Sequence, residues 1–308
     1  MEDSRYRSLR YTALFTVLAC VASAQQPAGA PMIGGAFARP GPIVIGQIQA
    51  VQPASGGATG TLTIAVTEQL RGEAAGPEIT LPYSTVRPNV KYPPFAWSRV
   101  APVAGHRVLL FLTGHKPDWN TVEVLDLNLG EDKFLPLVRG MVALEQQAER
   151  NEQAPLFTAL SGSNDELRQL ALDLLLNRTC PDNAECRMKV LEKTEAIAND
   201  SRQGRQNRTW AVSTIAHRLY TGFPNSAAVD KAAVASLAHL LTDTDERVRG
   251  EAVQGLHGLL FGGGSAKPQL QLAGPDRQRA AEQLRRDAQA GLDFSGRAKD
   301  LSDLVARQ

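Results

Sequence analysis

A repeat in the second half of the sequence limits the folds open to this chain. Three segments share an arginine, an alanine three residues later, and a large apolar residue four positions after the alanine. The first two arginines are 40 residues apart, and the next two are 41 apart. This period is typical of repeats built from two helices. The arginines are Arg168, Arg208 and Arg249, the alanines are Ala171, Ala211 and Ala252, and the apolar residues are Leu175, Ile215 and Leu256.

The spacing of apolar residues around this repeat predicts helices with one apolar face. Residues 248–260 carry such a face, and residues 227–241 carry another. The polar turn between them contains Asp243 and Asp245, and either carboxylate suits the start of the next helix. A helix with a single apolar face is stable only when a neighbour covers that face, so we expect these helices to stack.

The third copy resembles HEAT repeats through the pattern L-L-T-D-x-D-x-x-V-R-x-x-A at residues 240–252. The similarity covers residues 154–261, and two further helices, 276–290 and 295–306, would cap the stack. The resemblance implies an α-solenoid of HEAT-like helix pairs over residues 140–308. Such a solenoid has a concave face of the kind that binds proteins or extended peptides.

Residues 43–139 show a different period, typical of strands. Four segments alternate apolar and polar residues, and the fourth segment in chain order is almost continuously apolar. Because an open sheet of five strands would leave apolar edges, we expect a small antiparallel β-barrel that is OB-like. The predicted fold class is therefore α+β, with this barrel followed by the solenoid. The expected strands are 43–51, 59–70, 78–83, 106–113 and 121–128.

Two short motifs in this region resemble a β-domain of secreted bacterial proteins. Residues 66–72 read V-x-x-x-L-+-G, where the plus sign is a basic residue, and residues 105–112 read G-x-+-x-L-L-F-L. The resemblance implies a β-fold and carries no agreed activity.

The first residues have the order of an export signal. Basic residues precede an apolar run that is too short to span a bilayer, and Ala-Ser-Ala at 22–24 suits a signal peptidase. We expect residues 1–24 to be a signal peptide and the segment 25–42, rich in Pro, Gly and Ala, to be a flexible linker. Cys20 ends a Val-Leu-Ala-Cys sequence that resembles a lipobox. The expected location is therefore periplasmic or secreted, with an envelope lipoprotein attached to the membrane through a lipidated Cys20 as the alternative.

Cys180 and Cys186 are the cysteines that remain once Cys20 is set aside. A pair of cysteines in an exported protein predicts a disulfide. Their spacing does not fit a metal site, since it is not C-x-x-C and no histidine lies nearby in sequence. We expect no metal and no cofactor.

The connection 83–104 is the first candidate for binding. It mixes aromatic and basic side chains, which can form a recognition surface through Tyr92, Phe95 and Trp97. The alternative is that these aromatic rings fold back and close one end of the barrel, because large aromatic side chains are mostly buried.

The helical repeats supply the second candidate surface. His217 and His257 are 40 residues apart, and the spacing predicts that they face the same side, together with Arg208 and Arg249. The alternative is two polar positions on a solvated helix face.

Catalytic signatures are missing from the sequence. It contains no G-x-S-x-G, phosphate-binding loop, dinucleotide fingerprint or HExxH. Asp126 and Glu131 follow a strand, but such carboxylate pairs are too common to assign acid–base catalysis. The net charge of +1 gives no basic excess for nucleic acid.

These observations favour a non-catalytic protein of the cell envelope, or a secreted one, that binds a protein partner through the solenoid. One alternative is an enzyme or enzyme subunit with a site between barrel and solenoid. Another is a carbohydrate-binding module that uses the 83–104 connection.

The substitution Ala211→Trp tests the register of the repeat. The alanine is expected where paired helices approach closely, so a large ring would overpack the site and lower the melting temperature by many degrees. Thermal unfolding followed by circular dichroism measures the change. An unaltered melting curve would contradict the register.

Overall fold

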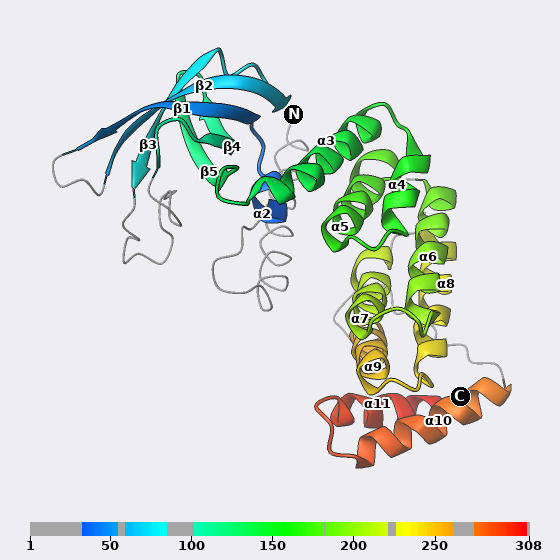
Figure 1. Cartoon of the computed structure of the whole chain (residues 1–308). Coiled ribbons are helices and arrows are strands. Elements are labelled where there is room, and N and C mark those ends of the chain that lie inside the picture. Colours follow the sequence, from blue (N-terminus) through cyan, green and yellow to red (C-terminus); the bar gives the residue numbers. More distant parts are fainter. Residues whose placement is uncertain are drawn as a thin grey trace, which may run out of the picture. The chain divides into compact units, whose positions relative to one another are not determined.

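The computed structural model describes residues 33–54, 59–84, 102–181, 183–220, 226–261 and 274–306. The chain divides into two compact units, Met1–Ala143 and Leu144–Gln308. The boundary falls inside helix α3 (Leu135–Glu149). The strands belong to the first unit, and the second is helical (Figure 1).

The first unit is built on one antiparallel sheet with the strand order β3-β2-β1-β4-β5. β1 lies at its centre and pairs with β2 along its whole length and with β4 over its first five residues. The five predicted strands are confirmed, with small differences at their ends. The strands are β1 (Ile43–Pro53), β2 (Thr59–Arg71), β3 (Glu78–Ser84), β4 (Arg107–His115) and β5 (Asp118–Asp126).

The prediction of a closed, OB-like barrel is wrong, because the sheet is open. β3 and β5 approach each other within 8 Å between Cα atoms, but they share no hydrogen-bonded ladder. Apolar edges favour closure, yet the β3 edge is protected in another way. β3 is short, it turns its apolar residues inward, and Pro82 has no N–H to offer to another strand.

The structure describes the segment before the sheet from Ile33 onward, inside the stretch 25–42 that we expected to be a flexible linker. Helix α2 (Ile33–Phe37) buries Ile33 and Phe37. Its position is set by Arg71 at the end of β2. The Arg71 guanidinium donates hydrogen bonds to the carbonyl oxygens of Phe37 at 2.7 Å, Arg39 at 2.6 Å and Gly41 at 3.1 Å.

The same guanidinium lies 4.5 Å from the centre of the Phe37 ring. The contact of a cation with an aromatic face stabilises the turn in addition to the hydrogen bonds. The last carbonyls of a helix have no N–H partner within the helix, so they need donors such as this guanidinium. One side chain therefore fastens the whole 37–41 turn to the sheet.

The two sequence motifs of this unit each contain a glycine that the backbone requires. Gly72 follows Arg71 with a φ of 80°, and a Cβ there would lie 2.9 Å from the Cα of Pro42. Gly105 has a φ of 88°, and its N–H donates to the carbonyl of Ile48 at 2.8 Å. Both conformations favour glycine, so the motifs mark turns at the ends of strands.

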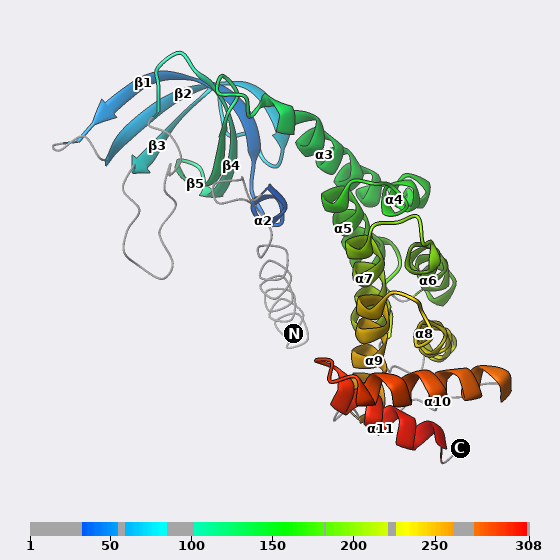
Figure 2. The ribbon, with the colours of Figure 1, turned by 60° about the horizontal axis from the view of Figure 1, so that its bottom comes forward.

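The second unit stacks helices in two layers. Figure 2 shows α5, α7 and α9 in one row, with α4, α6 and α8 beside it. The helices are α4 (Gln153–Leu160), α5 (Asp165–Leu174), α6 (Ala184–Asn199), α7 (Arg205–Thr214), α8 (Ala227–Leu240), α9 (Glu246–Phe261), α10 (Gly274–Gln289) and α11 (Ser295–Ala306). Shorter segments are the 3-10 turn η1 (Asp132–Phe134) and the π-helical turns η2 (Leu175–Thr179) and η3 (Ile215–Leu219).

The residues of the sequence repeat occupy equivalent buried positions in this unit. Its three alanines and its three large apolar residues are all fully buried in one continuous core that extends from Leu144 to Val305. α5 and α7 each run into a π-helical turn at the same repeat position, whereas α9 continues as a regular helix. In the part of the chain that the structure describes, no helix is both long and apolar enough to cross a membrane.

Replacing Arg71 with Met tests the fastening of the 37–41 turn. The variant keeps the aliphatic stem but loses three charge-assisted hydrogen bonds, so we expect the free energy of unfolding to fall by about 2 kcal/mol. Chemical denaturation measures this loss, and hydrogen exchange should show faster exchange at residues 33–42. The control is Arg139→Met in the same unit, which breaks an exposed ion pair with Glu68 and should change neither readout. Equal effects in the two variants would contradict the assignment.

Candidate functional site

The three repeat arginines lie inside the helical unit. The side chains of Arg168, Arg208 and Arg249 are 3%, 8% and 12% exposed. We call these three residues the arginine ladder. Each one reaches back to a backbone carbonyl just before its own helix.

These backward contacts satisfy carbonyls that lie at the ends of the preceding helices or in the turns. Arg168 binds the Gly162 oxygen through two nitrogens at 3.2 and 2.5 Å. Arg208 donates to the Ala198 oxygen at 2.8 Å, and Arg249 donates to the Asp243 oxygen at 2.9 Å. The ladder therefore ties each helix of the α5, α7 and α9 row to the turn that leads into it.

Each arginine of the ladder also reaches forward to a later helix pair. The Arg168 guanidinium lies 5.3 Å from the centre of the Trp210 ring in α7. Arg208 forms an ion pair with Asp243, in the turn before α9. Arg249 binds both carboxylate oxygens of Asp287 in α10, at 3.2 and 3.1 Å.

Buried charges of this kind must be paired, and here both members of each ion pair are shielded from water. The guanidinium groups of Arg208 and Arg249, which the sequence suggested as surface binding groups, are thus used to join helix pairs. The physical reason is position: three residues before a buried alanine, a side chain points into the stack.

The two predicted surface histidines have different surroundings. His217 is exposed in η3. His257 lies in α9, where it places Nε2 3.0 Å from Asp300 and stacks on Phe261, with ring centres 4.8 Å apart. Tyr92, Phe95 and Trp97 lie outside the described residues.

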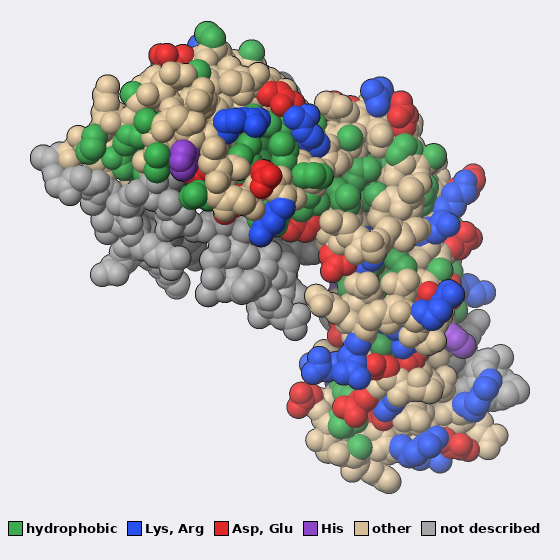
Figure 3. Space-filling view, viewed as in Figure 1, with side chains coloured by type: hydrophobic (Ala, Val, Ile, Leu, Met, Phe, Trp, Pro, Cys, Tyr) green, Lys and Arg blue, Asp and Glu red, His purple; other side chains and the backbone are tan. Residues whose placement is uncertain are grey.

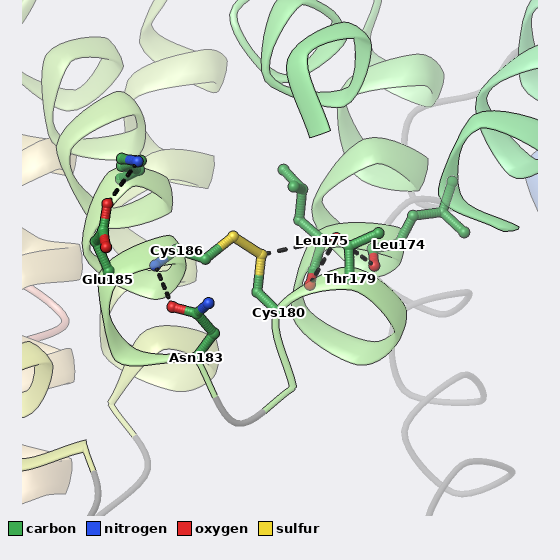
Figure 4. The surroundings of a disulfide bond; sticks show 8 residues. Leu174, Leu175, Thr179, Cys180, Asn183, Glu185 and Cys186 are labelled. Carbon is green, nitrogen blue, oxygen red and sulfur yellow. Dashed lines mark hydrogen bonds and ion pairs between the residues drawn. A yellow bond between two sulfur atoms is a disulfide. The ribbon is translucent and has the colours of Figure 1, made fainter. Parts of the chain in front are cut away.

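A disulfide joins Cys180 to Cys186, the pair expected from the sequence (Figure 4). It connects the end of η2 to the first turn of α6, and both cysteines are buried. Asn183 caps α6 by accepting a hydrogen bond from the Cys186 N–H at 2.9 Å. The next residue, Arg187, donates to the carbonyls of Arg218 and Leu219 at the end of η3. The start of α6 therefore holds both π-helical turns.

A further ion pair connects α5 to η3 in this region. Arg218 binds the carboxylate of Asp173. Burial raises the pKa of Asp173, and the neighbouring guanidinium offsets only part of that rise. The pair thus carries a desolvation cost that packing around it must offset.

The first unit contains a histidine–aspartate pair. His106 Nδ1 lies 2.8 Å from Asp126 Oδ2. Asp126 is buried, and its other oxygen accepts the N–H of Asn128 at 3.0 Å. Glu131 accepts the N–H of Asp126 at 2.7 Å, so the carboxylate is fixed from several sides.

Sequence reasoning missed this pair, because it considered Asp126 only with Glu131. The pairing of the strands could have shown it. His106 precedes β4 and Asp126 ends β5, and neighbouring antiparallel strands place those two ends together. The main chains of His106 and Asp126 also bond to two residues with exposed apolar side chains. The Val103 carbonyl accepts the His106 N–H, the Leu129 N–H donates to the Asp126 carbonyl, and Val103 and Leu129 are 44% and 50% exposed.

Within the described residues, no group of three or more His, Cys, Asp or Glu side chains is placed to hold a metal ion. No protein-family model matches the chain, and no curated protein matches it. The roles assigned here rest on geometry.

Replacing Arg208 with Met tests the ladder. The substitution leaves the Asp243 carboxylate shielded without its partner, so we expect a loss of about 3 kcal/mol in the free energy of unfolding. Urea denaturation measures it.

The matched control is Arg202→Met. Arg202 lies on the surface, where its guanidinium lowers the pKa of Asp200 to about 2. Exposed pairs contribute little, so this variant should unfold like the original protein. A similar loss in both variants would show that the ladder has no special role.

Proposed function

We propose that this chain is an exported, non-catalytic binding protein whose helical unit forms a HEAT-like solenoid and binds a protein partner. The observation that carries the proposal is the row of α5, α7 and α9, held by the arginine ladder. Because the ladder fixes neighbouring helix pairs, residues at one repeat position recur along the row at regular intervals.

One repeat position gives such an exposed line. Asn177 and His217 each lie six residues after a repeat alanine, in the equivalent turns η2 and η3, and both are exposed. A line that crosses several helix pairs suits an extended protein partner better than a small molecule. Over the face of this unit that is visible in Figure 3, acidic and basic side chains lie next to one another. This mixture suits a protein surface better than a polyanion.

Two features support export. The first 24 residues follow the order of a signal peptide, and the helical unit carries a disulfide. Attachment through a lipidated Cys20 stays the alternative to a free periplasmic or secreted form.

Site-specific crosslinking tests the binding surface. We would place the photoreactive residue benzoylphenylalanine at Asn177 or His217, on the exposed line, and at Lys193 as the control. Lys193 is also exposed, but it lies on α6 in the other layer. We expect both line positions to give the same covalent partner in native envelope extracts, with no adduct from Lys193.

The purified partner should then bind the unmodified protein with one stoichiometry. Crosslinking that is equal from all three positions, or absent from the line, would contradict the proposed surface.

A further inference from the structure

The imidazole of His106 has Nδ1 engaged by Asp126, and none of the described residues forms a hydrogen bond with its Nε2. An ionised carboxylate only accepts hydrogen bonds, so in the neutral ring Nδ1 must donate to Asp126 Oδ2 across the 2.8 Å contact. The lone pair is then on Nε2. Hydrogen bonds to both Asp126 oxygens, from His106 and from Asn128, hold the carboxylate and hence the ring.

The His106 side chain is 24% exposed, and among the residues that the structure describes none forms a hydrogen bond with Nε2. His257 provides the contrast within the same chain, since its Nε2 is taken by Asp300 at 3.0 Å. The arrangement at His106 is that of a nucleophile or base whose tautomer is set by a carboxylate.

The surroundings define what could approach. Val103 and Leu129, whose main chains form hydrogen bonds with those of His106 and Asp126, have exposed apolar side chains, and the Asp126 carboxylate is the charged group in contact with the ring. An uncharged compound with a small apolar group suits these surroundings.

We propose that His106, positioned by Asp126, is a nucleophilic site of the sheet unit that accepts an acyl group on Nε2 from a small uncharged acyl donor. The proposal does not depend on the helical unit or its partner.

The Nε2 lone pair forms a bond to the acyl carbon, and the bond from that carbon to the leaving oxygen breaks. The leaving group departs with the electron pair and takes up a proton from water, which leaves a hydroxide ion. The acylated ring is positive until Nδ1 passes its proton to Asp126, which leaves a neutral acylimidazole. Water then adds to the acyl carbon as the bond to Nε2 breaks, and the acid is released. Asp126 returns its proton to Nδ1, and the proton that water loses neutralises the hydroxide.

Diethyl pyrocarbonate, an uncharged acyl donor, tests the site in the whole protein at neutral pH. Mass spectrometry of peptides gives the acylation rate of each histidine separately. We expect His106 to react on the order of tenfold faster than His217, which is more exposed but has no carboxylate on its ring among the described residues. A rate for His106 equal to or below that of His217 would overturn the proposal.

The substitution Asp126→Asn tests whether the carboxylate sets the reactivity of His106, while it keeps a hydrogen bond that supports the fold. The amide oxygen can keep the hydrogen bond from Asn128, while the amide nitrogen now donates to Nδ1 and moves the ring proton to Nε2. We expect His106 to lose its excess reactivity, the rate at His217 to stay the same, and nitrogen NMR to show the other tautomer. Unchanged reactivity at His106 would contradict the proposal, and if the variant does not fold, the comparison within the original protein decides.

Discussion

The helical unit depends on guanidinium groups that lie within its stack. Each arginine of the ladder binds a carbonyl before its own helix and a ring or carboxylate in a later helix pair. The helices share one apolar core, but apolar contacts alone do not fix the register between pairs. Directional, charge-assisted hydrogen bonds supply that register. The small alanine three residues after each arginine allows neighbouring helices to approach closely, and this approach brings the guanidinium within reach of its partners.

The same device appears in the sheet unit. There Arg71 binds the backbone carbonyls of Phe37, Arg39 and Gly41 and covers a phenyl ring. In both units the planar guanidinium, which has several donors, forms hydrogen bonds with backbone carbonyls that have no partner within a helix or strand. A lysine could not satisfy so many acceptors in fixed directions. The basic residue of the 66–72 motif thus has a structural role, and so do the arginines of the repeat.

Much of the fold could be predicted from local pattern, and the failures have physical causes. Alternation located four of the strands, a continuous apolar run located β4, and the repeat located the buried alanines. Barrel closure could not be deduced, because it depends on how β3 and β5 meet across the sheet. Of the candidate site residues, Arg208 was expected on a binding surface from the repeat spacing, which does not show that its guanidinium is shielded by pairing with Asp243. His106 and Asp126 were separate in the sequence, and only strand pairing joined them.

The forward contacts of the ladder have a consequence for the order in which the chain is made. Each arginine contacts a side chain that is synthesised later. The partners are Trp210 for Arg168, Asp243 for Arg208, and Asp287 for Arg249. A buried guanidinium without its carboxylate is costly, so α9 cannot settle fully until α10 has left the ribosome. During synthesis, the last helix of the stack therefore contains a guanidinium without its carboxylate partner until α10 has been made.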